Sequence, residues 1–486
     1  MIPLTGFMPD ADSTTPGALT DCTNLVPTLR GMAGAPTPMD VPGLAQLPDE
    51  CRGGAVLQRL DKLARVFVGT RNKMFELSGT QYVDQSRAGG YTGSLENRWR
   101  FEQFGNASLA CNETEQIQVS TGIGTAFADI PQSPRARIIV IASGFVLAFG
   151  LNATYVGGDR PDAWACSGLY DHLTWNPSDS NQAAFGYLLN TPGDVRAAKR
   201  LGNDVVAYKE NSLYLGRFVG KPVIWQWDLL SSNVGAVSAE AVIDVGTAHL
   251  FIGRDNFWMF DGARPVPIKS APKEWFFANC DATYRYRIRS HFDQAKNLCW
   301  WFYPTPGSGG ALTNALVYNL TMDRWGKVQL PIETVLQYQG AETNYDNWPA
   351  DASLTFETLP DVPFDSPSLD TSSSSMGVVG TDHRIRTMNG PCGAASLTTG
   401  DFGDDEQFTT LTRLTPRFTA RPAASSLTHY TRDVDGGDLE TRGATALSGA
   451  HYDPLASGRY HRVRIDLQGD FELVGFTPAL TPDGYE

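Results

Sequence analysis

The chain has 486 residues, of which 42% are hydrophobic and 11% aromatic. This composition excludes a disordered chain and allows a large core in two or three domains. The formal net charge of −14 opposes tight binding to nucleic-acid phosphates. With 48 Gly and 30 Pro, the chain is interrupted too often for long helices, so short strands and turns are expected.

Residues 1–48 are predicted to form an extended arm, because proline forbids the interior of a regular helix or strand. The arm contains Pro3, Pro9, Pro16, Pro27, Pro36, Pro38, Pro42 and Pro48. Apolar residues such as Leu25 and Leu29 would anchor it along another surface. No basic, apolar leader opens the chain, and the most apolar run, 138–151, is too short for a bilayer. Neither a secretory signal nor a membrane span is therefore expected.

A recurrent pattern fills residues 49–390: a short apolar run, a polar turn, and an aromatic-rich run closed by glycine. The best pair is 66–79 and 250–262, with a weaker copy at 377–390. In two of the turns Asn211 and Asn256 occupy equivalent places, where a left-handed backbone is expected. Repeated hairpins favour radial repetition, since each small sheet needs a neighbour to bury its face. We predict an all-β fold with a β-propeller-like domain over 49–390; a large sandwich or barrel is the alternative.

The rest of the chain divides by composition. An acidic loop insertion is expected at about 340–376, where seven carboxylates and no Lys or Arg fall between Glu342 and Asp370. A Gly- and Asp-rich linker is predicted at 391–407, followed by a small C-terminal β unit at 408–486. Within that unit, alternation from Tyr460 specifies a strand with one apolar face.

Strict alternation from Thr283 to Arg289 predicts a strand with Arg285, Arg287 and Arg289 on one face. Such a face is either solvated or an interface to an acidic partner or a neighbouring copy. Three arginines against a net charge of −14 are a weak footprint for nucleic acid. We retain the three arginines as a candidate interface.

Motifs for catalysis or metal binding are not found. The seven histidines show no His-Glu-x-x-His and no pair at ligand spacing. The seven cysteines lack Cys-x-x-Cys spacing and are predicted to be reduced, packed thiols of a protein made in a cytoplasm. Gly216–Lys221 is one residue short of a phosphate loop, and Pro222 replaces its hydroxyl residue. We therefore predict no catalytic, cofactor-binding or metal residue, no cofactor and no enzyme activity.

Several stretches together resemble the tail nozzle, or tail hub, proteins of short-tailed bacteriophages (podoviruses). The stretches are Pro16–Gly31, Trp99–Asn106, Leu250–Gly262, Tyr318–Trp325 and Gly458–Ile465. The likeness covers most of the chain in order, through motifs that are individually unspecific. The acidic insertion departs from the pattern.

The resemblance implies a structural virion protein, a homohexamer that forms the distal nozzle tube of the tail after synthesis in the host cytoplasm. Adaptor and portal proteins would lie above it, and tail fibres or spikes would dock on its outside. Double-stranded DNA would pass through during ejection without specific binding. One alternative is a carbohydrate-binding or depolymerising β-propeller protein of a phage tail, and another is a scaffold propeller for protein partners.

Overall fold

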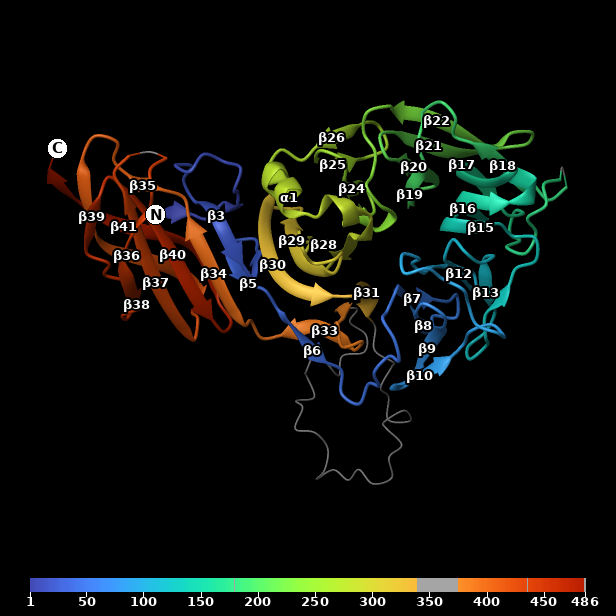
Figure 1. The fold of residues 1–486 in the computed structure, drawn as a ribbon, viewed down its shortest axis with the longest axis horizontal. Helices are drawn as coiled ribbons and strands as arrows, with labels where there is room; N and C mark the ends of the chain where they lie inside the picture. The colour runs from blue at the N-terminus through green and yellow to red at the C-terminus, as the bar shows by residue number, and fades with distance from the viewer. Residues whose placement is uncertain (179, 339–374, 435, 485–486) are drawn as a thin grey trace, which may run out of the picture.

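The computed structural model describes residues 1–178, 180–338, 375–434 and 436–484. In these ranges the chain is nearly all β (Figure 1), so the predicted all-β class is confirmed. The helical elements of the described residues are short: α1 (Lys273–Asn279), η1 (Thr154–Val156), η2 (Ala239–Ala241) and η3 (Ala282–Arg287). None of the described helices is long and apolar enough to cross a membrane. The predicted acidic insertion lies almost wholly outside the described residues.

Seven antiparallel sheets have four strands each, and we call them together the seven-sheet unit. The first three sheets are β7 (Gly54–Gln58), β8 (Ala64–Gly69), β9 (Met74–Ser78), β10 (Gln81–Asp84); β11 (Arg100–Phe104), β12 (Ala107–Cys111), β13 (Gln118–Ser120), β14 (Ala128–Asp129); and β15 (Arg135–Ala142), β16 (Phe145–Ala153), β17 (Gly158–Cys166), β18 (Ala184–Tyr187). The next three are β19 (Val195–Leu201), β20 (Asp204–Lys209), β21 (Leu213–Gly220), β22 (Ile224–Ser231); β23 (Val242–Asp244), β24 (His249–Ile252), β25 (Phe257–Phe260), β26 (Pro265–Pro267); and β27 (Arg289–Asp293), β28 (Leu298–Pro304), β29 (Leu312–Asn319), β30 (Arg324–Ile332). Each of these six sheets uses strands that are consecutive in the chain.

The seventh sheet combines both halves of the chain. It contains β31 (Thr334–Tyr338), β32 (Ser375–Val379), β33 (Ile385–Gly390) and, from the arm, β6 (Thr37–Asp40). Met39 pairs with Thr387, and the Asp40 carboxylate accepts a hydrogen bond from Arg386 Nε at 2.6 Å. The arm therefore supplies the outer strand of the last sheet.

The first strands of the seven sheets, which we call the inner strands, contact one another in chain order. β31 also contacts β7, so the succession of contacts returns to its start (Figure 1). Apolar clusters lie between neighbouring sheets; one contains Leu109 of β12 together with Val146 of β16 and Trp175, which follows β17. Strands such as β15 and β16 are buried on both faces, because a sheet in this position has a neighbour on either side.

The repeated sequence pattern corresponds to the second and third strands of a sheet. These hairpins are β8–β9, β20–β21, β24–β25 and β32–β33. The left-handed backbone expected at Asn211 and Asn256 is wrong, since neither residue has a positive φ. In the third copy the equivalent position is His383, and there φ is positive (62°). In its turn Asn256 uses its side chain, whose Oδ1 accepts from Phe257 N at 2.8 Å.

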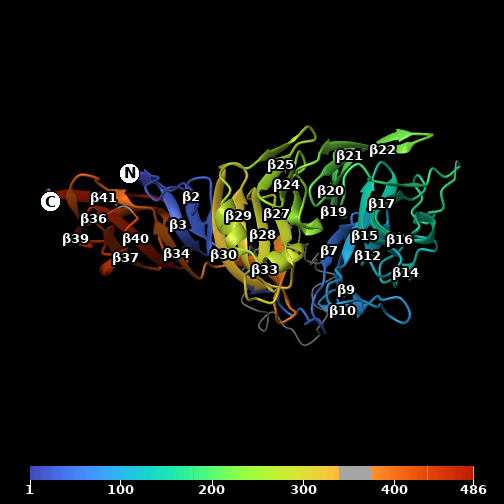
Figure 2. The ribbon, with the colours of Figure 1, turned by 45° about the horizontal axis from the view of Figure 1, so that its top comes forward.

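The other strands form two larger sheets, which we call the two-sheet unit. One sheet has the order β39 (Ala456–Gly458), β36 (Phe408–Ala420), β41 (Glu472–Gly484), β5 (Met32–Gly34), β4 (Leu25–Pro27), with β1 (Ile2–Pro3) also on β41. The other has the order β2 (Gly6–Phe7), β3 (Ala18–Thr23), β34 (Ala394–Thr399), β40 (Tyr460–Gln468), β37 (Ala424–Arg432), β38 (Glu440–Ala446), with β35 (Phe402–Gly403) on β40. Both chain ends lie in this unit (Figures 1 and 2).

Two sequence expectations are wrong here. The predicted linker 391–407 contains β34, which lies between β3 and β40 and buries Leu397 completely. The arm also forms regular strands, because Pro3, Pro27 and Pro38 fall in β1, β4 and β6 at sheet edges. An edge strand tolerates proline, since one side of it requires no donor.

The two units share a continuous apolar core that includes Phe7 of the arm and Trp325 of β30. Their backbones approach closely at Gly326, where a Cβ would lie 2.3 Å from Leu25 O. The Asp10 carboxylate accepts from Glu274 N and Trp275 N at 2.7 and 2.9 Å, at the start of α1. The arm thus fixes the two-sheet unit against the sheet that ends in β30.

Candidate functional site

The arginines predicted to share a strand face do not share one. Arg285 and Arg287 lie in the 3-10 helix η3, and only Arg289 lies in a strand, β27. Asp281 accounts for the helix, because its side chain accepts from Thr283 N at 2.9 Å and caps the first turn. The alternating sequence carried no sign of this cap competing with strand formation.

Each of the three arginines has a different environment. The Arg285 guanidinium lies 4.7 Å from the centre of the Phe277 ring. Arg287 donates through Nε to Glu96 at 2.9 Å. Arg289 is buried, and its Nη1 lies 3.3 Å from Glu240. An interface role for these residues stays a prediction.

A charged residue lies at or just before the start of every inner strand, a regularity that the sequence analysis missed. These residues are Arg52 before β7, Arg100 in β11, Arg135 in β15, Asp194 before β19, Glu240 before β23, Arg289 in β27 and Glu333 before β31. The number of residues between one of these charged residues and the next varies, so the sequence shows no repeat. The only signal that could have identified them is a charged residue just before each apolar run. Several are bonded together: Arg289 Nη2 donates to Arg52 O at 3.3 Å.

Glu240 is the centre of this group. Arg100 Nε lies 2.7 Å from its Oε1, and Arg289 approaches the same oxygen from a different sheet. Burial by itself raises the pKa of the Glu240 carboxyl, but Arg100 and Arg289 outweigh burial and hold it at about 2. A carboxylate held between two guanidinium groups links β11, β23 and β27.

Positive charge is in excess around Glu240. Burial, and next the cations of Arg289 and Arg52, lower the pKa of Arg98 to about 10. We define the inner-strand charge cluster as Glu50, Arg52, Glu96, Arg98, Arg100, Glu240, Arg287 and Arg289. Five arginines against three glutamates leave a surplus of two positive charges in a chain that is acidic as a whole.

Glu102, two residues after Arg100 in β11, behaves differently from Glu240. Burial raises the pKa of its carboxyl to about 7, in spite of Lys199 and Arg200, which lower it. The pKa values of two carboxyl groups associated with the inner strands therefore differ widely. Such a separation is found in acid–base pairs of enzymes and also in buried ion networks.

The cysteines are all free and buried, which confirms the predicted packed thiols. Burial raises the pKa of Cys51 and of Cys111 to about 12, so neither forms a reactive thiolate at neutral pH. In the described ranges, no group of three or more His, Cys, Asp or Glu residues is arranged to hold a metal ion.

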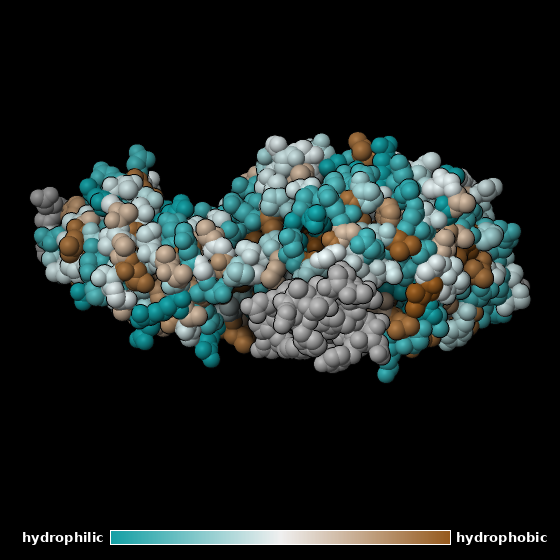
Figure 3. Space-filling model, turned by 90° about the horizontal axis from the view of Figure 1, so that it is seen from below, coloured by the Kyte–Doolittle hydropathy of each residue, from teal (hydrophilic) through white to brown (hydrophobic). Residues whose placement is uncertain are grey.

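The surface is mixed in character. Seen from below, apolar side chains occur in small groups among polar ones (Figure 3). Exposed apolar residues include Leu60 and Tyr170 in the seven-sheet unit and Leu455 in the two-sheet unit. Isolated residues of this kind are normal on a soluble surface.

Comparison with known proteins gives no family. No protein-family model and no curated protein matches the chain. Among solved structures, the computationally designed Ika8 protein is 10% identical, with a TM-score of 0.36 over 72% of this chain and 98% of that one. Two structures of the extracellular domain of BT4673 from B. thetaiotaomicron are 9% identical, with TM-scores of 0.39 and 0.42. The match covers 85% of this chain but 46% of theirs, less than half of their length.

Proposed function

We propose that the seven-sheet unit is a seven-bladed β-propeller and that the chain is a structural subunit of the nozzle of a short-tailed phage. The observation that carries the propeller is the closure: inner-strand contacts pass through seven sheets and return from β31 to β7. Completion of the last sheet by β6 joins a strand from before the first sheet to strands after the sixth. Radial repetition of four-stranded sheets around a centre is the propeller architecture.

Three features support a structural role. Arg100 and Arg289 form ion pairs with Glu240 inside the molecule, as expected of groups that hold strands together. The arm fastens the second unit to the first through Asp10, and through Leu25, whose carbonyl lies against Gly326; the subunit is elongated (Figure 1). A net charge of −14 suits a conduit that must release DNA without holding its phosphates.

In this proposal the subunit forms a homohexamer below the adaptor and portal proteins, with fibres or spikes on its outer side. Native mass spectrometry of the purified chain tests it. We expect an assembly of about six chains, and negative-stain images should show a ring with a central opening. A chain that stays monomeric at all concentrations, and on mixing with particles lacking their nozzle, would contradict the proposal.

A second function, cleavage of a surface polysaccharide, has one observation in its favour. Glu102 and Glu240 both belong to the inner-strand region and have pKa values of about 7 and about 2. A glycosidase requires such an acid and such a carboxylate. Release of reducing ends from host polysaccharide by the wild-type chain, abolished in Glu102→Gln, would favour this function. The structural proposal predicts no release by either chain.

A further inference from the structure

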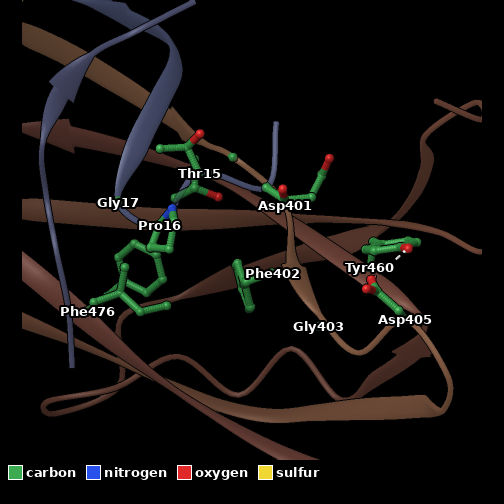
Figure 4. A pocket seen from close by; sticks show the side chains of 13 residues that line it. Thr15, Pro16, Gly17, Asp401, Phe402, Gly403, Asp405, Tyr460 and Phe476 are labelled. Carbon is green, nitrogen blue, oxygen red and sulfur yellow. Dashed lines mark hydrogen bonds between the residues drawn. The ribbon is translucent and has the colours of Figure 1, made fainter. Parts of the chain in front are cut away.

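A half-open hollow of 230 Å³ lies in the two-sheet unit, at the place where the arm crosses the C-terminal strands (Figure 4). Its walls are residues 14–17 of the arm, the segment 399–403 with Asp405, and Tyr460 and Phe476 of the last two strands. In Figure 4, Phe402 lies between Phe476 on one side and the Tyr460–Asp405 pair on the other. Segments from opposite ends of the chain therefore build one site.

Close backbone packing and backbone hydrogen bonds hold these walls in place. A Cβ at Gly17 would lie 1.9 Å from Pro3 O, and one at Gly400 would lie 2.3 Å from Ser13 O. Gly400 N donates to Ala18 O at 2.9 Å, and Asp401 N donates to Ser13 O at 2.6 Å. The arm is therefore fixed on the segment 399–403, and the hollow is preformed.

The deepest carboxylate in the wall is fully occupied. The Asp401 side chain is completely buried and accepts from Arg462 Nε at 2.9 Å and from Arg432 Nη2 at 2.5 Å. Asp405 lies at the rim, and its Oδ1 accepts from the Tyr460 hydroxyl at 2.9 Å. Asp405 Oδ2 is left as an acceptor for a ligand, since a carboxylate has capacity for several hydrogen bonds.

The charged groups named above balance. Arg432 and Arg462, which pair with Asp401 behind the lining, contribute two positive charges, and Asp401 and Asp405 contribute two negative ones. A charged ligand would lose its hydration without a net opposite charge to compensate, so a neutral ligand is favoured. The lining also combines the apolar rings of Phe402 and Phe476 with the polar oxygens of Asp405, Thr14 and Thr15.

We propose that this hollow binds a single neutral sugar ring, such as the terminal residue of a glycan. A sugar has an apolar C–H face for Phe402 and several hydroxyl donors for Asp405 and the threonines. The volume far exceeds the ~10–15 Å³ that one water requires. It falls below the ~300 Å³ at which pockets for drug-sized molecules begin. The proposal is independent of the nozzle assignment, because a sugar site on the two-sheet unit is compatible with either candidate function.

Saturation-transfer difference NMR on the full chain tests this site, with glucose, galactose, mannose and N-acetylglucosamine as probes at millimolar concentration. We expect saturation transfer to at least one sugar, reduced at least fivefold in Asp405→Ala. Tyr460→Phe should reduce it less, because the Asp405 carboxylate itself remains as an acceptor. The matched control is Asp466→Ala on β40, the strand that also contains Tyr460. The Asp466 carboxylate pairs with Arg464 outside the hollow, so this variant should bind like wild type.

Thermal melting of each variant establishes that it is folded. Thr15→Val provides a second substitution, on the wall across the hollow from Asp405 (Figure 4). N-acetyl-lysine methylamide serves as a cationic probe. Absence of transfer to all four sugars would overturn the proposal, and so would equal transfer in wild type and in folded Asp405→Ala. Transfer to the lysine probe alone would assign the hollow to a basic peptide and would equally overturn it.

Discussion

The seven-sheet and two-sheet units are built from the same kind of strand but assembled in opposite ways. In the first, six sheets are meanders of consecutive strands, such as β11 to β14 within residues 100–129. In the second, β3 of the arm pairs with β34, and β1 pairs with β41. Local pairing closes short loops, whereas pairing between the chain ends requires contacts of very long range. We infer that the seven-sheet unit organises first and that the arm completes both units afterwards.

The units also resemble each other in one respect. Each contains a carboxylate held by two arginines: Glu240 by Arg100 and Arg289, and Asp401 by Arg432 and Arg462. The Asp401 side chain is fully buried, while that of Glu240 is 20% exposed. The same arrangement should therefore be worth more to stability in the two-sheet unit.

Removal of residues 1–40 should have the largest effect, because these residues supply β1 to β5 of one unit and β6 of the other. We expect the two-sheet unit to lose its fold and the seventh sheet to lose its outer strand. Limited proteolysis should cut rapidly within 391–484, while 54–332 persists longer. Leu29→Ala, at an exposed position of the same segment, is the control. An unchanged melting temperature in the truncated chain would contradict the proposed role of the arm.

Asp401→Ala should destabilise the chain by about 3–5 kcal/mol, since it leaves the buried Arg432 and the half-buried Arg462 without the Asp401 carboxylate. Glu240→Ala should cost less, about 1–3 kcal/mol, because water reaches that site. Urea unfolding curves give both values. Asp466→Ala, which removes an exposed pair with Arg464, should change stability by less than about 1 kcal/mol. Equal costs for Asp401 and Glu240 would remove the contrast between the units.

Gly326→Ala should cost about 2–3 kcal/mol, because the new Cβ meets the Leu25 carbonyl and neither backbone is free to move. Weaker attachment should separate the unfolding of the two units, so that calorimetry shows two transitions in place of one. Gly393→Ala is the control, since its nearest contact would be ordinary, 3.6 Å from the Thr37 methyl group. A single unshifted transition in Gly326→Ala would contradict the close junction.

The histidine pair of the two-sheet unit should make stability fall in acid. Burial lowers the pKa of both His429 and His461 to about 4, whereas the unfolded histidines titrate near 6.5. Below pH 6.5 the unfolded chain binds more protons than the folded one, so stability decreases as the pH falls from 6.5 to 4. We expect a loss of roughly 6 kcal/mol over this window, because each of the two buried histidines contributes about 3 kcal/mol.

The contacts of the pair agree with neutral rings. Thr409 Oγ1 donates to Gly458 O at 3.3 Å and so accepts from His461 Nε2 at 2.9 Å. His461 Nδ1 is then the acceptor for His429 Nε2, also at 2.9 Å. Protonation of His461 would break this chain of donors. Urea unfolding at pH 7 and pH 4.5 measures the loss, which should be smaller in His429→Gln; an identical pH dependence would contradict this account.

Glu102→Gln should have the smallest effect and the opposite pH dependence. The folded carboxyl titrates at about 7 and the unfolded one near 4.3. Between these values the folded chain binds the extra proton, so the wild type loses stability as the pH rises through this window. Glutamine removes this penalty. The Glu102 side chain is only half-buried, and solvent screening reduces the contribution, so the variant should gain about 1 kcal/mol at pH 8 and nothing at pH 4. Thermal melting at the two pH values measures the gain, and destabilisation at pH 8 would contradict it.

Prediction from sequence succeeded where structure is local. The hairpins at 66–79 and 250–262 form as expected, because apolar runs and turn residues specify them without distant partners. The strands around Ser143–Gly144 are buried on both faces, as their continuous apolar sequence indicates. Prediction failed at Arg285 and Arg287, where the Asp281 cap favours a 3-10 helix over an alternating strand. It also failed at β34, whose partners are distant in sequence.

The sequence by itself determined that this chain is built from short antiparallel strands and where most of their hairpins turn, because turn chemistry and side-chain alternation act within a few residues. Only the tertiary structure decided that the arm completes three sheets, that inner-strand charges gather around Glu240, and that Thr15 and Tyr460 face one hollow. These outcomes depend on segments from opposite ends of the chain, such as Ile2 and Phe476. Their association follows from burying shared apolar surface, which leaves no periodic signal in either segment alone.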